Sequence, residues 1–371
     1  MLSVIQISLA IWTGQLLVPF SLCASSVVQE PPTRKIPLPY VTLATAPRYS
    51  TVAQMPAIDR TGYDRDIRAL ATLNVPAEDL LSAAGNFPSE WIVANSEESL
   101  PSLRNHFLKQ PSVAGLLLAG PLAVPALLDH LNDSTKTSTK IINQKQQILK
   151  FGSVWHGNAA NPIESGVLTL TRSCYGGGAL EDDAFSNLVS QIDSYTFTVG
   201  DVCLVILGQI VGRNYPCICD VTKYGTAISS PVYDSDLRKK LIAIWGQSNT
   251  RQYIFESLMY DFCTRGILQG DSLDLWNEGN ELQVSAVERL LLYFPNESLK
   301  VIADRVRELA LGSDEYSDAI RNGVIAADLI RAMRPFKNAE LEAALTDLRS
   351  ESLQPEAIRA IDAVLDAWNH K

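Results

Sequence analysis

The final third of the chain repeats apolar residues at the spacing of an α-helix, and this pattern limits the possible folds more than any other feature. Between residues 234 and 371, apolar side chains recur three or four positions apart, with charged side chains on the opposite face. The stripes are Leu237, Leu241, Ile244 and Trp245; Val284, Val287, Leu291 and Phe294; Leu299, Ile302, Val306 and Leu309; and Ile358, Ile361, Leu365 and Trp368. One helix pair cannot bury stripes of this width, but pairs stacked side by side bury a continuous core. The sequence therefore predicts a mainly α protein of stacked antiparallel helix pairs.

An internal repeat favours the same arrangement. A shift of 42 residues places similar side chains opposite one another in two successive helices and the turn between them. The matched positions are Leu291 with Met333, Phe294 with Phe336, Asn296 with Asn338, Leu299 with Leu341, Val306 with Leu348, and Arg307 with Arg349. A period of roughly 40–47 residues is the one expected of HEAT or armadillo helix pairs. The alternative is an irregular helical bundle, which obeys the same packing rules.

Two short segments resemble parts of other proteins. Residues 123–133, Ala-Val-Pro-Ala-Leu-Leu-Asp-His-Leu-Asn-Asp, resemble the second helix and exit turn of a HEAT repeat. This resemblance implies a HEAT-like α-solenoid. Residues 199–215 resemble a block in uncharacterised exported bacterial proteins, which implies no known activity. Because this block is apolar nearly all round, we expect a buried central helix with Asp201 as its cap or first-turn acid.

The first 25 residues have the layout of a secretory signal peptide. They carry no charged side chain, and a long apolar stretch is followed by the small residues Ala24 and Ser25. The Lys or Arg that normally stands near the start of a signal is missing. The alternative is an uncleaved membrane anchor, but polar interruptions such as Gln6 and Gln15 argue against it. We therefore expect an exported protein, in the periplasm, at the cell surface or outside the cell.

The rest of the chain divides into a tether and one helical domain. Six prolines between residues 26 and 60 predict an extended segment. Residues 61–371 form the predicted helical domain, which an irregular, glycine-rich insert interrupts at about 145–198. Within the insert, residues 167–171 and 195–199 alternate apolar and polar side chains, so two short strands are expected there.

Charge and hydropathy exclude two classes of partner. The chain has 41 acidic and 31 basic side chains, and its net charge of -10 repels phosphate backbones. After the leader, no segment reaches about 18 consecutive apolar residues. We therefore expect no nucleic-acid partner and no membrane contact beyond the signal segment.

Catalytic and metal-binding signatures are sparse. The four histidines have no second His or Cys at metal-ligand spacing, and no phosphate loop or dinucleotide fingerprint is present, so no metal or cofactor is predicted. The insert does bring together His156, Glu164 and Cys174. His156 could activate Cys174 as a nucleophile, with Glu164 orienting the imidazole. The simpler interpretation is a loop of ordinary turn residues.

Several other polar residues and thiols have structural interpretations. Arg213 could cap the central helix, or it could form a buried ion pair with an acid such as Asp201. Cys203 lies in an apolar run, so we expect a buried thiol. In an exported protein, Cys217 or Cys219 could form a disulfide with Cys174 or Cys263.

The predicted function is that of an exported helical-repeat protein acting as a binding or structural scaffold. Solenoids work through extended surfaces, so the expected partner is another protein or a cell-surface polymer. The alternative is an enzyme whose Cys/His site lies in the insert at 145–198.

Overall fold

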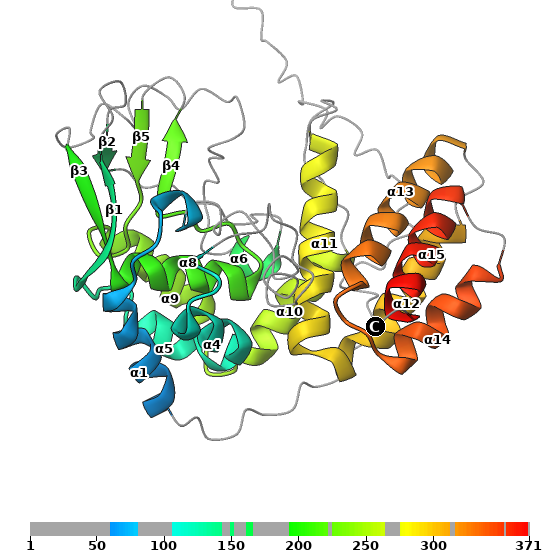
Figure 1. Ribbon diagram of the computed structural model, residues 1–371, viewed down its shortest axis with the longest axis horizontal. Coiled ribbons are helices and arrows are strands. Elements are labelled where there is room, and N and C mark those ends of the chain that lie inside the picture. The colour runs from blue at the N-terminus through cyan, green and yellow to red at the C-terminus, as the bar shows by residue number, and fades with distance from the viewer. Residues whose placement is uncertain are drawn as a thin grey trace, which may run out of the picture. The chain divides into compact units, whose positions relative to one another are not determined.

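The protein is built around α8 (Val199–Val211), a helix in which every residue is buried (Figure 1). Its start is a capping box. The Thr198 hydroxyl accepts a hydrogen bond from the Asp201 N–H at 3.3 Å, and the Asp201 carboxylate accepts from the Thr198 N–H at 2.8 Å. The expected buried central helix, capped by Asp201, is therefore confirmed.

The computed structural model describes residues 60–80, 106–142, 149–151, 161–165, 193–221, 225–263, 275–311, 316–351 and 354–369. In this part of the chain most residues are helical, which confirms the predicted mainly α fold. Helices and short helical turns that precede and follow α8 in the sequence pack around it and against one another. They are α1 (Arg60–Ala69), η1 (Leu70–Thr72), α4 (Pro111–Ala119), η2 (Gly120–Leu122), α5 (Val124–Asp129) and α9 (Ser235–Trp245).

Two small sheets accompany these helices. β1 (Lys136–Ile142) pairs antiparallel with β3 (Ser194–Thr198), so that Lys140 lies opposite Thr196. In the second sheet the central strand β5 pairs with a parallel and an antiparallel neighbour. Its members are β2 (Leu149–Phe151), β4 (Ile218–Val221) and β5 (Gly225–Ile228).

The predicted insert accordingly contains ordered elements. β3 matches the strand expected at 195–199 and leads directly into α8. The insert also contributes β2 and the single-turn helix α6 (Pro162–Ser165). The other strand, expected at 167–171, lies outside the described residues.

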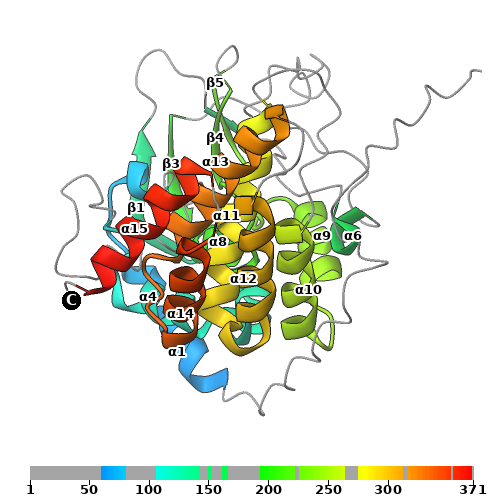
Figure 2. The ribbon, with the colours of Figure 1, turned by 90° about the vertical axis from the view of Figure 1, so that its right-hand side faces the viewer.

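The C-terminal helices form two layers, visible in Figure 2. α13 contacts both α11 and α15 in one layer, while α12 contacts α14 in the other. α10 links these layers to the helices around α8, because it contacts α11 as well as α8 and α9. The bounds are α10 (Thr250–Cys263), α11 (Leu275–Tyr293), α12 (Pro295–Leu311), α13 (Tyr316–Met333), α14 (Ala339–Arg349) and α15 (Pro355–Asn369).

The 42-residue shift maps α11 onto α13 and α12 onto α14. The aligned side chains Leu291 and Met333 are both buried, as are Leu299 and Leu341. The sequence repeat therefore corresponds to equivalent core positions in successive helices of each layer.

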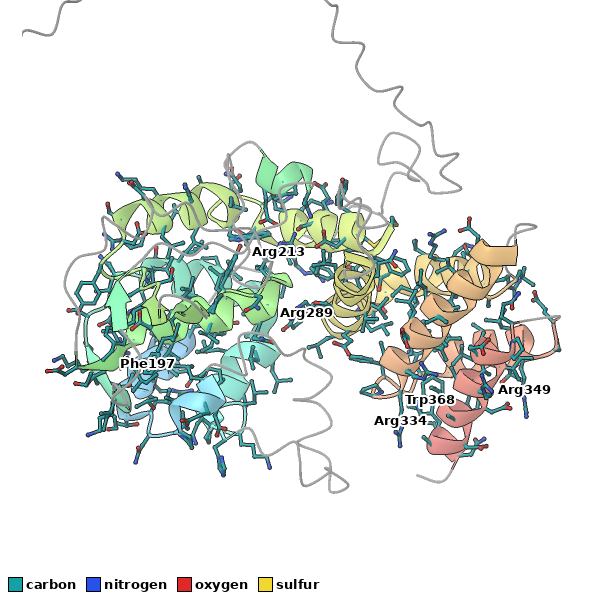
Figure 3. The ribbon with its side chains drawn as sticks, turned by 90° about the horizontal axis from the view of Figure 1, so that it is seen from above. Phe197, Arg213, Arg289, Arg334, Arg349 and Trp368 are labelled. Carbon is teal, nitrogen blue, oxygen red and sulfur yellow. The ribbon has the colours of Figure 1, made fainter. Side chains whose placement is uncertain are left out.

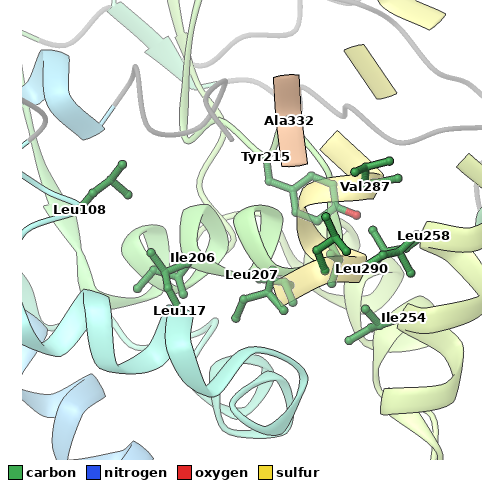
Figure 4. Close-up of a cluster of buried hydrophobic side chains, with 14 of the residues drawn as sticks. Leu108, Leu117, Ile206, Leu207, Tyr215, Ile254, Leu258, Val287, Leu290 and Ala332 are labelled. Atoms are coloured by element: carbon green, nitrogen blue, oxygen red, sulfur yellow. The ribbon is translucent and has the colours of Figure 1, made fainter. Parts of the chain in front are cut away.

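One cluster of buried apolar side chains runs through the whole described region. Figure 4 shows its centre, where Leu207 of α8, Leu258 of α10 and Leu290 of α11 come together. At the far end of the chain, Trp368 is buried and donates its indole N–H to the Arg334 carbonyl at 2.7 Å, which ties α15 to the end of α13. Burying this apolar surface is the main term that stabilises the helix layers.

Candidate functional site

The most highly charged buried region lies where α8 ends. Gly212 terminates the helix with a φ of 73°, and the Arg213 N–H turns back to the Gly208 carbonyl at 2.9 Å. The last carbonyl groups of a helix lack partners within the helix, and here they are buried, so they need other donors. Arg289 of α11 donates from Nε to the Gln209 carbonyl at 2.5 Å, and Arg213 donates from Nη1 to the Gly212 carbonyl at 2.9 Å. Two guanidinium groups thus occupy the negative end of α8 (Figure 3).

Arg213 also joins two buried carboxylates. Its Nε donates to Glu164 of α6, and its Nη1 donates to Asp261 of α10 at 2.5 Å. Its Nη2 donates to the Ser257 hydroxyl at 3.0 Å. Burial tends to lower the pKa of Arg213, but the charges of Asp261 and Glu164 outweigh that effect and raise it, so the guanidinium stays charged.

Asn161 completes this group. Its Nδ2 lies 3.0 Å from both the Asp261 carboxylate and the Ser257 hydroxyl, and 3.1 Å from the Ser257 carbonyl. Its Oδ1 accepts the N–H of Ile163 at 3.1 Å and so caps the start of α6. We call the five residues Asn161, Glu164, Arg213, Ser257 and Asp261 the Arg213 network.

The second arginine has a different environment. Burial lowers the pKa of Arg289 to about 10, and the nearby Tyr293 and Glu288 only partly offset that fall. The side chain is still cationic at neutral pH. Its other donor contacts are with the carbonyl of Ser285, at 3.0 Å, and with the hydroxyl of the same residue. Arg289 therefore serves mainly to satisfy backbone carbonyl groups.

The geometry of the Arg213 network is that of a structural support. Each of its five side chains belongs to a residue that is at most 4% exposed. Its charged groups hydrogen-bond to one another, so removing Arg213 would leave two carboxylates buried without their counter-charge. Such an arrangement fixes the end of α8 against α6 and α10, but it presents no exposed nucleophile or acid to a substrate.

The predicted site residues fall partly in this network. Glu164 is fully buried and pairs with Arg213, a partner that the sequence did not predict for it. His156 and Cys174 lie outside the described residues. The catalytic arrangement of His156, Cys174 and Glu164 therefore stays a prediction.

The buried ion pair predicted for Arg213 exists, but Asp201 was the wrong partner. These residues stand at opposite ends of α8, about 18 Å apart for a straight helix. Asp201 instead accepts hydrogen bonds from the Tyr195 hydroxyl at 2.6 Å and from Thr198. Burial raises the pKa of the Asp201 carboxyl, and these hydrogen bonds oppose the rise.

The cysteines required one correction. Cys203 is the buried thiol that was expected. Cys217 is also a buried free thiol, so the alternative in which it pairs with Cys174 or Cys263 is wrong, while a pairing of Cys219 stays untested. Burial raises the thiol pKa of both Cys203 and Cys217, which keeps them protonated and unreactive.

Sequence reasoning missed Asn161, Ser257 and Asp261 entirely. Asp261 is 48 positions from Arg213, and Asn161 is 96 positions from Ser257. Ser257 and Asp261 do share one face of α10, four positions apart, and both sit among apolar residues. This spacing of two polar residues within α10 was a weak signal, because the helix carries other polar residues as well.

Two further observations bear on the site. Among the described side chains, no group of three His, Cys, Asp or Glu residues is arranged to hold a metal ion. None of the described helices has the length and hydropathy needed to cross a membrane. Comparison with known proteins found no matching family model, no matching curated relative and no matching solved structure.

Proposed function

We propose that this protein is an exported scaffold that binds another protein or a cell-surface polymer through the outer faces of its C-terminal helices. The observation that supports this proposal is the layered arrangement of α11 to α15, with α13 between α11 and α15 and with α12 beside α14. Layers of this kind expose one face of each helix in series, and helical-repeat proteins bind their partners along such faces. A HEAT-like repeat is part of the same proposal.

The exposed faces of the last two helices carry polar residues and alanines. In α14, the exposed residues Glu340, Ala343 and Asp347 recur three and four positions apart and so share one face. In α15, Arg359 and Ala363 share a face in the same way. A partner at these faces would make mainly polar contacts, as in most non-obligate interfaces.

Export is the other half of the proposal, and residues 1–25 support it because they have the composition of a signal peptide. Fractionation of the native host, followed by N-terminal sequencing, tests this point. We expect cleavage after Ala24 or Ser25, so the exported fraction should contain a chain that begins at Ser25 or Ser26. A cytosolic protein that retains Met1 would contradict export.

Site-specific photo-crosslinking tests the binding surface. A photoreactive amino acid replaces Ala343 on α14 or Ala363 on α15, and Ala243 on α9 is the matched control. All three are exposed alanines within helices, so the substitution disturbs no core contact. We expect a discrete adduct at Ala343 or Ala363 and none at Ala243. The same adducts at all three positions, or none at either C-terminal position, would contradict the proposed surface.

A further inference from the structure

The short segment that carries Glu164 makes several buried polar contacts. α6 has four residues and packs against α10. Ile163 of this segment packs against the apolar core and is only half-buried. Buried hydrogen bonds join Asn161 to α10 and Glu164 to Arg213. Docking of residues 161–165 therefore depends on charge and hydrogen bonding.

The two carboxylates on Arg213 come from very different elements. Asp261 belongs to α10, a helix of 14 residues that buries large apolar side chains such as Leu258 and Phe262. Glu164 belongs to a helix of four residues. Asp261 is thus fixed by the apolar packing of a long helix, whereas Glu164 stands on a single helical turn and is joined to Arg213 by an ion pair.

This difference allows the segment to leave without stranding a buried charge. If residues 161–165 move away, Arg213 keeps its contacts with the Asp261 carboxylate, the Ser257 hydroxyl and the Gly212 carbonyl. Glu164 departs with its own segment and becomes hydrated. An unpaired buried ion is what normally makes breaking such a pair costly, and neither state contains one.

We propose that the Arg213 network is a latch, in which residues 161–165 dock on α10 and undock from it as a unit while α8, α10 and α11 stay folded. Glu164 is the releasable member of the latch, and Asp261 is the permanent one. The inference does not depend on the proposed scaffold function, since it concerns only contacts inside the chain.

Hydrogen exchange on the full-length protein tests the latch. Glu164→Gln keeps the shape of the side chain but removes its charge, so it weakens docking. Because a hydrogen bond to a charged group is stronger than one to a neutral group, we expect the amides of residues 161–165 to exchange about tenfold to a hundredfold faster. Exchange in α8 and α10 should not change.

Two further variants separate a latch from a general loss of structure. Asp261→Asn removes the permanent carboxylate, so we expect faster exchange in α10 and at the end of α8, together with a lower melting temperature. Glu297→Gln is the matched control, because Glu297 pairs at 3.2 Å with Arg251 at the start of α10, whereas Asp261 lies near the end of that helix. This control should leave residues 161–165 as slow to exchange as in the unmodified protein.

Three outcomes would overturn the latch. The first is unchanged exchange at residues 161–165 in Glu164→Gln. The second is an acceleration that spreads equally over α8 and α10 in this variant. The third is failure of the Glu164→Gln variant to fold, since the proposal requires that the helices stay satisfied without Glu164.

Discussion

At the scale of single residues, the end of α8 depends on a backbone conformation that few residues adopt. Gly212 has a φ of +73°, and a Cβ atom placed on it would lie 3.1 Å from Leu258 Cδ2 and 3.4 Å from Arg289 Cδ. A side chain at this position would therefore meet backbone strain and crowding together. Replacing Gly212 would also disturb the turn that directs Arg213 toward its carboxylates.

We expect Gly212→Ala to lower the free energy of unfolding by about 1–3 kcal/mol, measured by urea denaturation. Gly62 of α1 provides the control, because a Cβ atom there has no neighbour within 4 Å and φ is not positive. In a helix, Ala is favoured over Gly, so Gly62→Ala should stabilise the protein by about 0.5–1 kcal/mol. Equal effects of the two changes would show that the conformation of Gly212 contributes nothing.

At the scale of elements, a set of polar side-chain contacts links α1, the end of α5 and the start of β1. Asp133 follows α5 and accepts the Thr135 N–H at 2.9 Å. The His130 ring lies between Asp133, at 3.3 Å, and Asp64 of α1, at 3.7 Å. Burial acts to raise the pKa of Asp133, but the hydrogen bonds from Thr135 and His130 outweigh it, so the pKa is lowered. The ionised carboxylate therefore stabilises the junction of α1, α5 and β1.

A lowered pKa fixes the sign of the pH dependence. The contribution of Asp133 to stability is fully present above the pKa of the unfolded chain, about 3.9, and is lost as the pH falls through the lower pKa of the folded state. We expect Asp133→Asn to lower the free energy of unfolding by about 0.5–1.5 kcal/mol at pH 7. Denaturation curves at pH 7 and pH 3 should show this difference shrinking in acid. Asp347→Asn, an exposed carboxylate of α14, should give no such difference.

The elements themselves were largely predictable, and for a definite reason. Amphipathic stripes mark a helix by local spacing alone, so α9, α11, α12 and α15 could be predicted from residues within a few positions of one another. The capping box at the start of α8 also depends on local spacing, because Asp201 lies three positions after Thr198. The partners of Arg213 were not predictable, because packing brings together α6, α8 and α10 over 48 or more positions.

At the scale of the whole molecule, the fold could be predicted from local spacing, whereas the site depends on contacts between residues far apart in the sequence. The mainly α fold was predicted from the helical spacing of apolar residues, and this spacing recurs from one helix to the next. The Arg213 network occurs once, and it uses common residue types at no characteristic spacing. Asp201 and Asp261 are both buried acids of helices, and only the path of the chain after Gly212 determines that Arg213 meets Asp261.

The position of a helix in the contact pattern should also decide how far a defect spreads. α11 contacts α10, α12 and α13, whereas α14 contacts α12 and α15. In stacked helices each unit stabilises its neighbours, so a central defect should affect more of the chain than a terminal one. Leu290 of α11 and Leu345 of α14 form a matched pair for this test, being 0% and 3% exposed.

We expect Leu290→Ala and Leu345→Ala to cost about 2–5 kcal/mol each at the site of the substitution, because both create a cavity in the core. Hydrogen exchange should then differ in extent. Leu290→Ala should accelerate exchange in α8, α10 and α13, while Leu345→Ala should accelerate it only in α12, α14 and α15. If the Leu345→Ala variant loses hydrogen-exchange protection in α8 as well, the helices unfold as one cooperative unit. In that case the contacts between neighbouring helices would not determine how far the loss of stability spreads.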